Sequence, residues 1–480
     1  MELNEILQQR QAKFSALKAK GVPVYDKVFA ENTPIVEATS GFQEGKRVSL
    51  CGRIMAKRLH GKVLFLDLRD ASARIQLYIR EDFVGKDKFA ILSDIDIADI
   101  IGAKGELFKT HTGEATVKVE DFVVLAKAFR PLPEKWHGLK DVELRYRQRY
   151  LDLIANEEVK KVFLIRAKII KAMRNFLEDR GFLEVETPMM HAIPGGAAGR
   201  PFKTRHNEYG IDLYLRIAPE LYLKRLLVAG LDKVYEINRS FRNEGVSTKH
   251  NPEFTMLEVY SAYADYEDMM QLCQDLIVFV TKEVLGKTSF DYQASPVDMA
   301  TPWEKKSFAE IVKDKFDIQP CDEAAVMIKK LQAKGFAKEK NKLTRSQVAK
   351  IIEELLEEEM KTNPTFVTDY FTDLCPLAKS KKDNPLLSER FELFIAGIEI
   401  GNAYSELNDP QEQKERFQAE IKDLAGEEKK EVDEDYILAL EHGMPPAGGL
   451  GLGIDRLVML LANQPSIRDV ILFPLLRPQI

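Results

Sequence analysis

The alternation of polar and apolar residues over residues 234–260 predicts a hairpin with one unusually polar face. Two alternating sets flank a loop that contains Gly245 and Pro252: they are Glu236, Asn238, Ser240, Arg242 and Glu244, then Phe254, Met256, Glu258 and Tyr260. Cross-strand partners point the same way, so a register that sets Glu244 opposite Phe254 places both sets on one face.

This face carries a cation, several carboxylates and an aromatic ring. Arg242 can bind a phosphate or a carboxylate with two hydrogen bonds, and Phe254 offers a stacking surface for a base. The stretch therefore indicates an anionic, planar ligand. A solvated hairpin is the alternative, since polar residues are common on exposed strands.

Five short alternating segments predict a small β-barrel of the OB type in the N-terminal part of the chain. They span residues 47–55, 62–70, 73–80, 97–110 and 115–125. The expected core positions are Leu64, Leu66 and Leu68 in the second segment and Ile75, Leu77 and Ile79 in the third. Phe65 and Gln76 then lie on the outer face, where Phe65 can stack a base and Gln76 can read its edge.

Other patterns predict the domain organisation. Residues 2–20 read as an exposed helix whose lysines either contact phosphate or face solvent. A proline-containing linker ends near residue 140, so we expect one domain over residues 1–140 and a second over residues 141–480. Residues 303–362 are highly charged with helical spacing, which indicates an inserted helical subdomain.

A second polar hairpin is predicted over residues 390–409. With its turn at Ala396 and Gly397, Phe394 pairs with Glu399, so Glu392 and Glu399 share a face. Two carboxylates at such a short separation repel one another unless a cation lies between them. Mg²⁺ held partly by ATP phosphate would suit the pair, because this hard ion needs few protein ligands. Arginines that answer both carboxylates structurally are the alternative.

Farther along the same hairpin, Asn402, Tyr404 and Glu406 alternate along one face. A buried carboxylate at this place would select an ammonium group, which the side chain of lysine carries. Glu220, at the end of a short predicted strand and just before an apolar helix, is either a second ligand or a carboxylate that the helix dipole favours.

Glycine-rich segments predict a close approach of the backbone to a ligand. Gly195 and Gly196 lie in one such loop, and residues 445–464 join a glycine-rich strand to an amphipathic helix. The second segment lacks Gly-Lys-Ser/Thr, so it is not a P-loop. Arg456 at the start of its helix is well placed for a phosphate.

Composition narrows the class of protein. A length of 480 residues suffices for more than one domain, and 45% apolar with 30% charged residues are typical of a soluble chain. The net charge of −6 gives no global attraction to nucleic acid, so RNA would be bound by a local surface. The four widely spaced cysteines indicate neither a zinc cluster nor a disulfide framework. We expect a cytoplasmic protein, because the N-terminus is amphipathic and no apolar run is long enough to cross a membrane.

Taken together, three stretches resemble motifs 1, 2 and 3 of the class II aminoacyl-tRNA synthetases, in the expected order. They are the helix and strand of residues 157–190, the hairpin of residues 234–260 and the segment of residues 445–464. The residues of these motifs are most similar to those of the bacterial-type lysyl-tRNA synthetase family of class IIb. This resemblance implies an α+β catalytic domain on an antiparallel sheet, an N-terminal OB-fold anticodon-binding domain and a homodimer.

The resemblance also implies an activity. Lysine would be activated by ATP to lysyl-adenylate and pyrophosphate, and then transferred to the 3′ end of tRNA(Lys). In the catalytic pair, Arg242 would hold the α-phosphate and the carboxylate, while Arg456 holds distal phosphates. The other ATP contacts it implies are Glu244, His250, Asn251, Phe254 and Glu392, and Mg²⁺ would lie on Glu392 and Glu399.

The remaining sites follow from the same resemblance. Lysine would lie against Gly196, Glu220, Glu258, Tyr260, Asn402 and Glu406, with Tyr260 and Glu406 nearest its side-chain ammonium group. The anticodon would contact Arg58, Phe65, Gln76 and Glu114 in the barrel.

Three rival interpretations stay open at this point. An aspartyl- or asparaginyl-tRNA synthetase has the same architecture, but should place an arginine where this chain offers acids. A paralogue that lysylates a protein would lack the barrel. A catalytically inactive RNA-binding module would tolerate the loss of Arg242 or Arg456, and this chain retains both.

Overall fold

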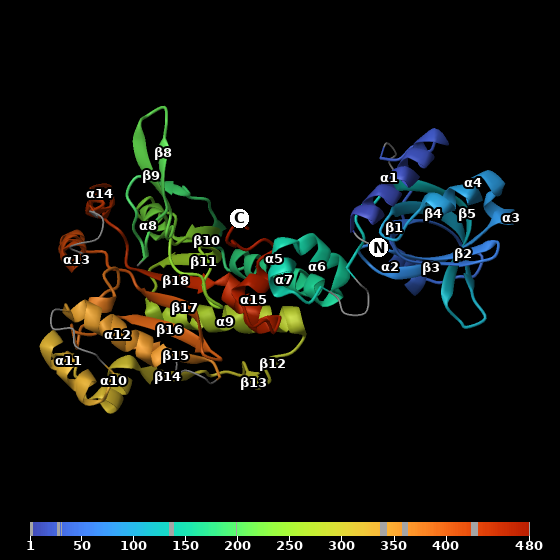
Figure 1. The fold of residues 1–480 in the computed structure, drawn as a ribbon. Coiled ribbons are helices and arrows are strands. Elements are labelled where there is room, and N and C mark those ends of the chain that lie inside the picture. The colour runs from blue at the N-terminus through green and yellow to red at the C-terminus, as the bar shows by residue number, and fades with distance from the viewer. Residues whose placement is uncertain are drawn as a thin grey trace. The chain divides into compact units, whose positions relative to one another are not determined.

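A computed structural model describes residues 3–25, 29, 31–133, 139–197, 199–336, 343–357, 363–423 and 431–479 (Figure 1). The chain divides into two compact units, Met1–Lys140 and Asp141–Ile480. Part of the predicted linker, residues 134–138, lies outside the described residues. Among the described helices, none combines the length and the apolar character needed to cross a membrane.

The N-terminal unit contains a closed five-stranded barrel, which confirms the predicted OB-type fold. Its strands follow the order β1 (Arg47–His60), β2 (Val63–Arg69), β3 (Arg74–Arg80), β5 (Ala115–Ala126) and β4 (Ile100–Lys109). The six core positions expected in β2 and β3 are all buried. Helices α1 (Leu3–Ala19), α2 (Ile35–Ser40), α3 (Glu81–Val84) and α4 (Lys86–Ile91) and the 3-10 turn η1 (Leu92–Asp94) complete the unit.

The predicted N-terminal helix is present as α1, but two of its lysines are already paired. Lys13 Nζ lies 2.5 Å from Asp96 Oδ1, and Lys20 Nζ lies 2.6 Å from Asp94 Oδ2. These ion pairs favour a structural use of the two lysines over a contact with phosphate.

The C-terminal unit is built on an eight-stranded sheet. Its order is β14 (Glu304–Ser307), β15 (Thr365–Thr368), β16 (Arg390–Ile395), β17 (Ile398–Ser405), β18 (Ala447–Gly453), β11 (Glu253–Ala262), β10 (Lys233–Phe241) and β6 (Leu183–Glu184). Neighbours from β15 to β10 are antiparallel, whereas the edge strands β14 and β6 are parallel to theirs. The expected α+β fold on an antiparallel sheet is confirmed.

Helices cover one face of this sheet. The covering helices are α7 (Glu157–Glu178), α9 (Tyr266–Leu285) and α15 (Ile454–Leu461), and they contact one another as well as the strands (Figure 1). Leu257 and Val259 of β11 belong to the apolar core on this side. Because side chains alternate along a strand, Glu258 and its even-numbered neighbours point to the opposite face. That face carries the predicted polar residues.

The ends of α9 show why the sequence folds in this way locally. The Asp265 side chain accepts hydrogen bonds from the amides of Glu267 and Asp268 at 2.9 and 3.1 Å, and the Asp268 side chain accepts one from the Asp265 amide. Gly286 ends the helix in the left-handed region, with a φ of +70°.

Residues 303–362 are helical only in part. They contain α10 (Phe308–Phe316), α11 (Ala324–Ala333) and α12 (Arg345–Glu357), but residues 304–307 form the edge strand β14 of the main sheet. Val348, Ile352 and Phe394 belong to one apolar cluster, so α12 packs against β16. Residues 337–342 and 358–362 lie outside the described part of the chain.

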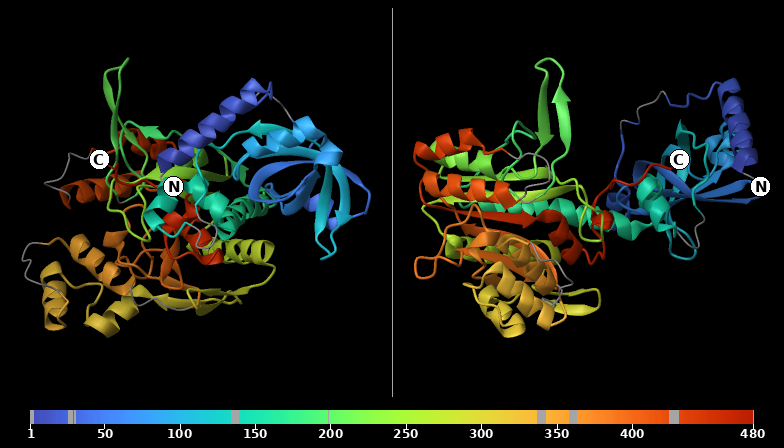
Figure 2. Two further views of the ribbon diagram at one scale, coloured as in Figure 1. Left: turned by 45° about the vertical axis from the view of Figure 1, so that its right-hand side comes forward. Right: turned by 60° about the vertical axis from the view of Figure 1, so that its left-hand side comes forward.

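The other elements surround this sheet. They are α5 (Val142–Arg147), α6 (Arg149–Ala155), β7 (Met190–His191), β8 (Lys203–His206), β9 (Ile211–Leu215), α8 (Glu220–Val228), β12 (Ser289–Tyr292), β13 (Ser295–Asp298), η2 (Thr372–Leu374), α13 (Pro410–Asp423), α14 (Glu434–Glu441) and α16 (Ile467–Val470). The β8–β9 hairpin projects away from the sheet in both views of Figure 2.

Candidate active site

The predicted polar hairpin is formed by β10 and β11, but its register differs from the expectation. Ser240, not Glu244, lies opposite Phe254. β10 ends at Phe241, and Glu244 belongs to the loop that follows. A shift of four residues preserves the even spacing, so the predicted set within the strands still shares one face.

Backbone hydrogen bonds explain where the strand ends. The Arg242 amide donates to the Pro252 carbonyl at 2.9 Å, and the Asn243 amide donates to the Arg200 carbonyl at 2.7 Å. The second bond draws the chain toward the glycine-containing loop before the sheet. Glu244 therefore reaches the site from the loop and not from the strand.

Arg242 lies over Phe254, and its Nε has no hydrogen-bond partner within the described part of the protein. Its guanidinium carbon is 5.1 Å from the Phe254 ring centroid. Its Nε is buried and has no hydrogen-bond partner among the described residues. Burial lowers the pKa of Arg242, and the nearby Glu244 and Glu399 oppose this shift. A half-buried cation whose Nε is buried and unpaired suits an oxyanion ligand.

Arg456 and His250, both predicted to bind phosphate, lie in contact with each other. Arg456 Nη1 donates to Glu399 Oε2 at 2.8 Å, and Arg456 Nη2 lies 3.2 Å from His250 Nε2. Burial, together with the charge of Arg456, lowers the pKa of His250, which keeps its ring neutral near pH 7. Asn251 is buried next to it and donates to the Glu253 carbonyl at 2.6 Å.

The second hairpin, β16–β17, has the predicted pairing of Phe394 with Glu399. A bulge between Leu393 and Phe394 then shifts the register, so Glu392 lies opposite Asn402. Burial raises the pKa of Glu392 to about 8, and the charge of Glu399 adds to this shift. The pKa of Glu399 is lowered instead, because Arg456 outweighs the effect of burial.

Both glutamates are answered by arginines in this structure. Glu392 forms an ion pair with Arg390 and accepts a hydrogen bond from Tyr370 OH at 2.8 Å, while Glu399 pairs with Arg456. No group of three or more acidic, histidine or cysteine residues in the described part of the chain is arranged to hold a metal. A metal here would need oxygen ligands from a bound molecule, such as the phosphates of ATP.

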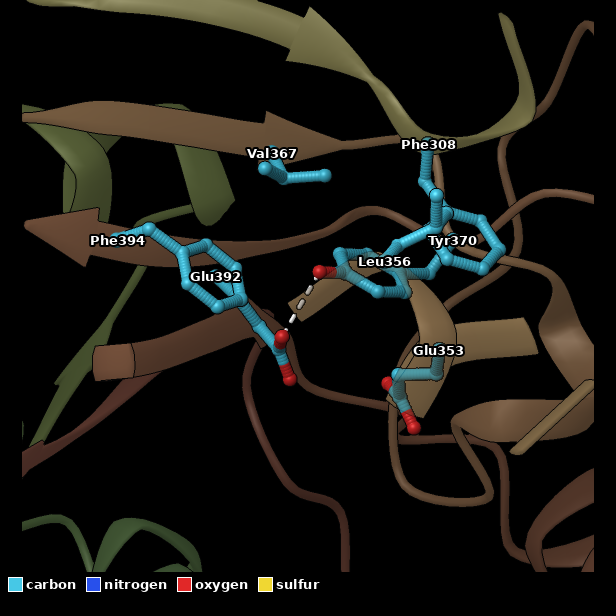
Figure 3. Close-up of a pocket in the computed structure, with 7 residues that line it drawn as sticks. All are labelled: Phe308, Glu353, Leu356, Val367, Tyr370, Glu392 and Phe394. Carbon is cyan, nitrogen blue, oxygen red and sulfur yellow. Dashed lines mark hydrogen bonds between the residues drawn. The ribbon is translucent and has the colours of Figure 1, made fainter. Parts of the chain in front are cut away.

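A small pocket extends from Glu392 toward α12 (Figure 3). It is lined by Phe308, Glu353, Leu356, Val367, Tyr370, Glu392 and Phe394. Glu353 Oε1 lies 3.5 Å from Arg390 Nη2, so Arg390 is shared between a glutamate of α12 and Glu392. The charged residues 303–362 thus send one carboxylate toward the site, which the sequence did not predict.

The predicted amino-acid ligands gather in a buried acidic pocket. Glu220 is the first residue of α8 and accepts from Tyr404 OH at 2.7 Å. Glu258 accepts from Tyr260 OH at 3.1 Å. Glu406 follows β17 directly and is fully buried. Burial and the charge of Glu220 raise the pKa of Glu258 to about 8, and burial also raises the pKa of Glu406. A cationic ligand would relieve this crowding of acids.

Glycines let these side chains lie against the backbone. A Cβ atom on Gly449 would come within 1.9 Å of Glu406 Oε1 and 2.6 Å of the Tyr260 ring. A Cβ on Gly196, whose φ is +86°, would lie 3.2 Å from the Glu220 Cβ. The predicted close approach at β18 therefore serves the pocket's own side chains.

Two residues of this region lie differently from the expectation or were missed. Asn402 Oδ1 accepts from Arg390 Nε at 3.0 Å, which ties it to Glu392 across its own hairpin and not to the acidic pocket. Lys224, which was not predicted from the sequence as a site residue, donates to Glu220 Oε1 at 2.6 Å and pairs with Glu406. The signal was its position one helical turn after Glu220 on an apolar helix.

The four residues predicted to read RNA form two neighbouring pairs on the barrel. Arg58 lies opposite Phe65 in the β1–β2 ladder, and Gln76 Nε2 donates to Glu114 Oε2 at 3.1 Å. The rings of Phe65 and Tyr78 are 5.3 Å apart. Tyr78 therefore extends the aromatic surface of this face.

Comparisons with known proteins agree with this geometry. The model of the family described as tRNA synthetases class II (D, K and N) matches residues 141–477, and that of the OB-fold nucleic acid binding domain matches residues 48–125. A protein named lysine–tRNA ligase from Carboxydothermus hydrogenoformans is 52% identical, covering 100% of this chain and 99% of the relative. Proteins of the same name from Pelotomaculum thermopropionicum (100% and 96% covered) and Bacillus subtilis (99% and 98%) are 53% and 48% identical. The chain belongs to the class II tRNA synthetase family of the D, K and N type, with an OB-fold nucleic acid binding domain before its catalytic unit.

Proposed function

We propose that this chain is a lysine–tRNA ligase, which activates L-lysine with ATP and transfers it to tRNA(Lys). Relatives of that name are about half identical over the whole chain. The observation that carries the choice of amino acid is the buried pocket of Glu220, Glu258 and Glu406 beside the cation Arg242. Acids answer the ammonium groups of lysine, and the arginine answers its carboxylate.

In the first step, the protein aligns the lysine carboxylate with the α-phosphate of ATP. Arg242 binds both groups, and Arg456 with His250 binds the distal phosphates that leave as pyrophosphate. Phe254 and Glu244 hold adenine, and Asn251 supports this loop. Little covalent participation by the protein is needed, because alignment and neutralisation of charge lower the barrier.

Mg²⁺ belongs to the same proposal. Glu392 and Glu399 would hold it together with ATP phosphate, which accords with its need for few protein ligands. The raised pKa of Glu392 is the observation that supports this fit, since a divalent cation can replace the proton that burial favours. When bound, the ion would neutralise charge on the phosphates.

Lysine would contact Gly196, Glu220, Glu258, Tyr260, Asn402 and Glu406. Glu406 and Tyr260 meet over Gly449, so they form the end of the pocket that suits the side-chain ammonium group. An aspartate substrate would need a free cation at this end, where Glu406 lies.

Residues 1–140 would bind the anticodon and residues 141–480 would catalyse both steps. Phe65 with Arg58 would stack a base, and Gln76 with Glu114 would read one. A homodimer is supported by exposed apolar side chains on α7, β6 and the segment after them, namely Leu164, Leu183, Met189 and Met190, which are 50–55% exposed. As part of translation, the protein would act in the cytoplasm.

The test is exchange of labelled pyrophosphate into ATP in the presence of single amino acids. We expect exchange with lysine and at most weak exchange with aspartate or asparagine. No exchange with lysine, or stronger exchange with either of the other two, would reject the assignment.

A further inference from the structure

Lys224 is a cation of the chain's own inside the acidic pocket. It lies one helical turn after Glu220 in α8, and its side chain is fully buried. Its Nζ donates to Glu220 Oε1 at 2.6 Å and forms an ion pair with Glu406. Two of the three carboxylates of the pocket therefore already share one ammonium group.

The surroundings keep Lys224 in this place. The Tyr404 ring centroid lies 5.5 Å from its Nζ, and Leu221, Leu223 and Leu227 of the same helix belong to an apolar cluster. Burying an ammonium group is unfavourable unless carboxylates answer it. The apolar neighbours offer no such partner, so the ion pair with the two glutamates is a fixed part of the site.

Glu406 nevertheless retains capacity for a ligand. The side chain is fully buried, and neither carboxylate oxygen has a hydrogen-bond partner of good geometry among the described residues, although Lys224 lies against one of them. A buried carboxylate accepts more than one hydrogen bond from cations. Lys224 thus fixes the position of the Glu406 side chain but leaves its carboxylate able to accept hydrogen bonds from a ligand.

The formal charges of these four side chains indicate which ligand the pocket can balance. Glu220, Glu258 and Glu406 carry three negative charges when ionised, and Lys224 carries one positive charge, which leaves a net charge of −2. In the proposed function, Arg242 answers the substrate carboxylate, so the pocket must match two ammonium groups. Resting on that function, we infer that Lys224 is a positioning residue that matches the net charge of the pocket to a diamino acid.

Loss of this cation should damage lysine binding more than ATP binding. With three carboxylates facing one another, an unpaired one takes up a proton or turns away, and the substrate loses an acceptor. ATP binding depends on Arg242, Arg456 and His250, which come from other elements. The expected sign is therefore a weaker affinity for lysine, even though the pocket becomes formally more negative.

The first test is Lys224→Met in the pyrophosphate exchange assay. We expect the KM for lysine to rise about 30-fold, as for truncation of one partner of a buried charge pair. The KM for ATP should stay within about twofold, because the change is confined to the acidic pocket. Arg225→Gln is the matched control, since it removes the same charge from the next residue, which pairs with Asp433 and Asp435. Its KM for lysine should not change.

The double variant Lys224→Met/Glu220→Gln separates charge balance from packing. Its pocket again has a net charge of −2. When Glu220→Gln is already present, adding Lys224→Met should therefore raise the KM for lysine by less than about threefold. This comparison remains decisive if the single Lys224→Met variant fails to fold. If Lys224→Met raises the KM for lysine about 30-fold even when Glu220→Gln is already present, the inference is overturned. A KM for lysine within twofold of wild type in Lys224→Met would also overturn it. A wild-type protein without lysine-dependent exchange would instead overturn the proposed function.

Discussion

The outer face of the barrel and the polar face of the catalytic sheet both carry charged residues. The two faces differ in how far these residues are paired within the protein. On the barrel, the buried carboxylate of Asp67 is answered by Arg58 at 3.1 Å and Arg74 at 3.0 Å. On the sheet, Arg242 Nε and both oxygens of Glu406 are buried without a well-formed hydrogen bond in the described part of the chain.

This difference distinguishes residues that stabilise the fold from residues whose polar groups are paired only when a ligand binds. A buried polar group without a partner costs free energy that binding can return. The sheet face therefore carries such a cost in the free protein, whereas the barrel face is satisfied on its own. Substitutions on the sheet should change activity strongly and stability little, and those on the barrel should have smaller effects on activity.

The largest effect is expected for Arg242→Met. The rate of pyrophosphate exchange should fall about 1,000-fold, the upper range for removal of one charged group that stabilises a transition state. The temperature of unfolding should not fall, because the variant removes a half-buried cation whose buried Nε has no hydrogen-bond partner among the described residues. Arg239→Gln is the control, as its exposed guanidinium pairs with Glu253 at 3.4 Å and lies one residue off the polar set. A large loss of stability in Arg242→Met would break the comparison.

Glu406→Gln should have the next largest effect, and it should be selective. We expect the KM for lysine to rise about 100-fold, because a charged hydrogen bond to the substrate becomes a neutral one and Lys224 loses a partner. The KM for ATP should change much less. Exchange kinetics at varied lysine and varied ATP measure both constants, with the exposed Glu441→Gln as control. Equal rises in both constants would remove Glu406 from the ammonium site.

The pH dependence of lysine binding should be intermediate in size. Glu258 has a pKa raised from 4.5 to about 8. Between these values, the lysine-free native protein keeps a proton that the unfolded chain has lost, so Glu258 makes the free energy of unfolding fall as pH rises across this window. An ammonium group binds the ionised form. The KM for lysine should therefore fall about tenfold per pH unit as pH rises from 6 toward 8.

Glu258→Gln supplies the control for this titration. The variant should bind lysine more weakly at pH 8, and its KM should depend much less on pH. Proton release on lysine binding, measured by calorimetry in buffers of different ionisation enthalpy, should disappear in the variant. An unchanged pH profile would show that another group of the pocket titrates.

Local alternation was enough to predict both polar hairpins, because burial distinguishes only even from odd positions. It could not predict the register of Ser240 opposite Phe254, because β10 ends at Phe241 and the Asn243 amide bonds to the distant Arg200 carbonyl instead of continuing the ladder. The bulge between Leu393 and Phe394 was likewise invisible to a pattern of period two.

Lys224 shows a second limit of the sequence. Its spacing from Glu220 is that of an ordinary surface ion pair on a helix. Only the fold brings Glu406 from the end of β17 against the same ammonium group and buries all three. The same holds for Glu353 of α12, whose partner Arg390 comes from another part of the chain. Charges on amphipathic helices cannot be sorted into exposed and buried from their spacing alone.

The smallest effect is expected on the barrel, for Phe65→Ala. Loss of one stacking surface should raise the KM for tRNA about tenfold, since base stacking on an aromatic ring contributes about 1–3 kcal/mol. Pyrophosphate exchange should be unchanged, because that reaction needs no tRNA. Ile97→Ala, which shortens another exposed apolar residue of the same unit, is the control. If charging were unaffected while Arg58 and Tyr78 kept their places, Phe65 would be an ordinary surface residue, and the satisfied face of the barrel would have to bind RNA through its charges alone.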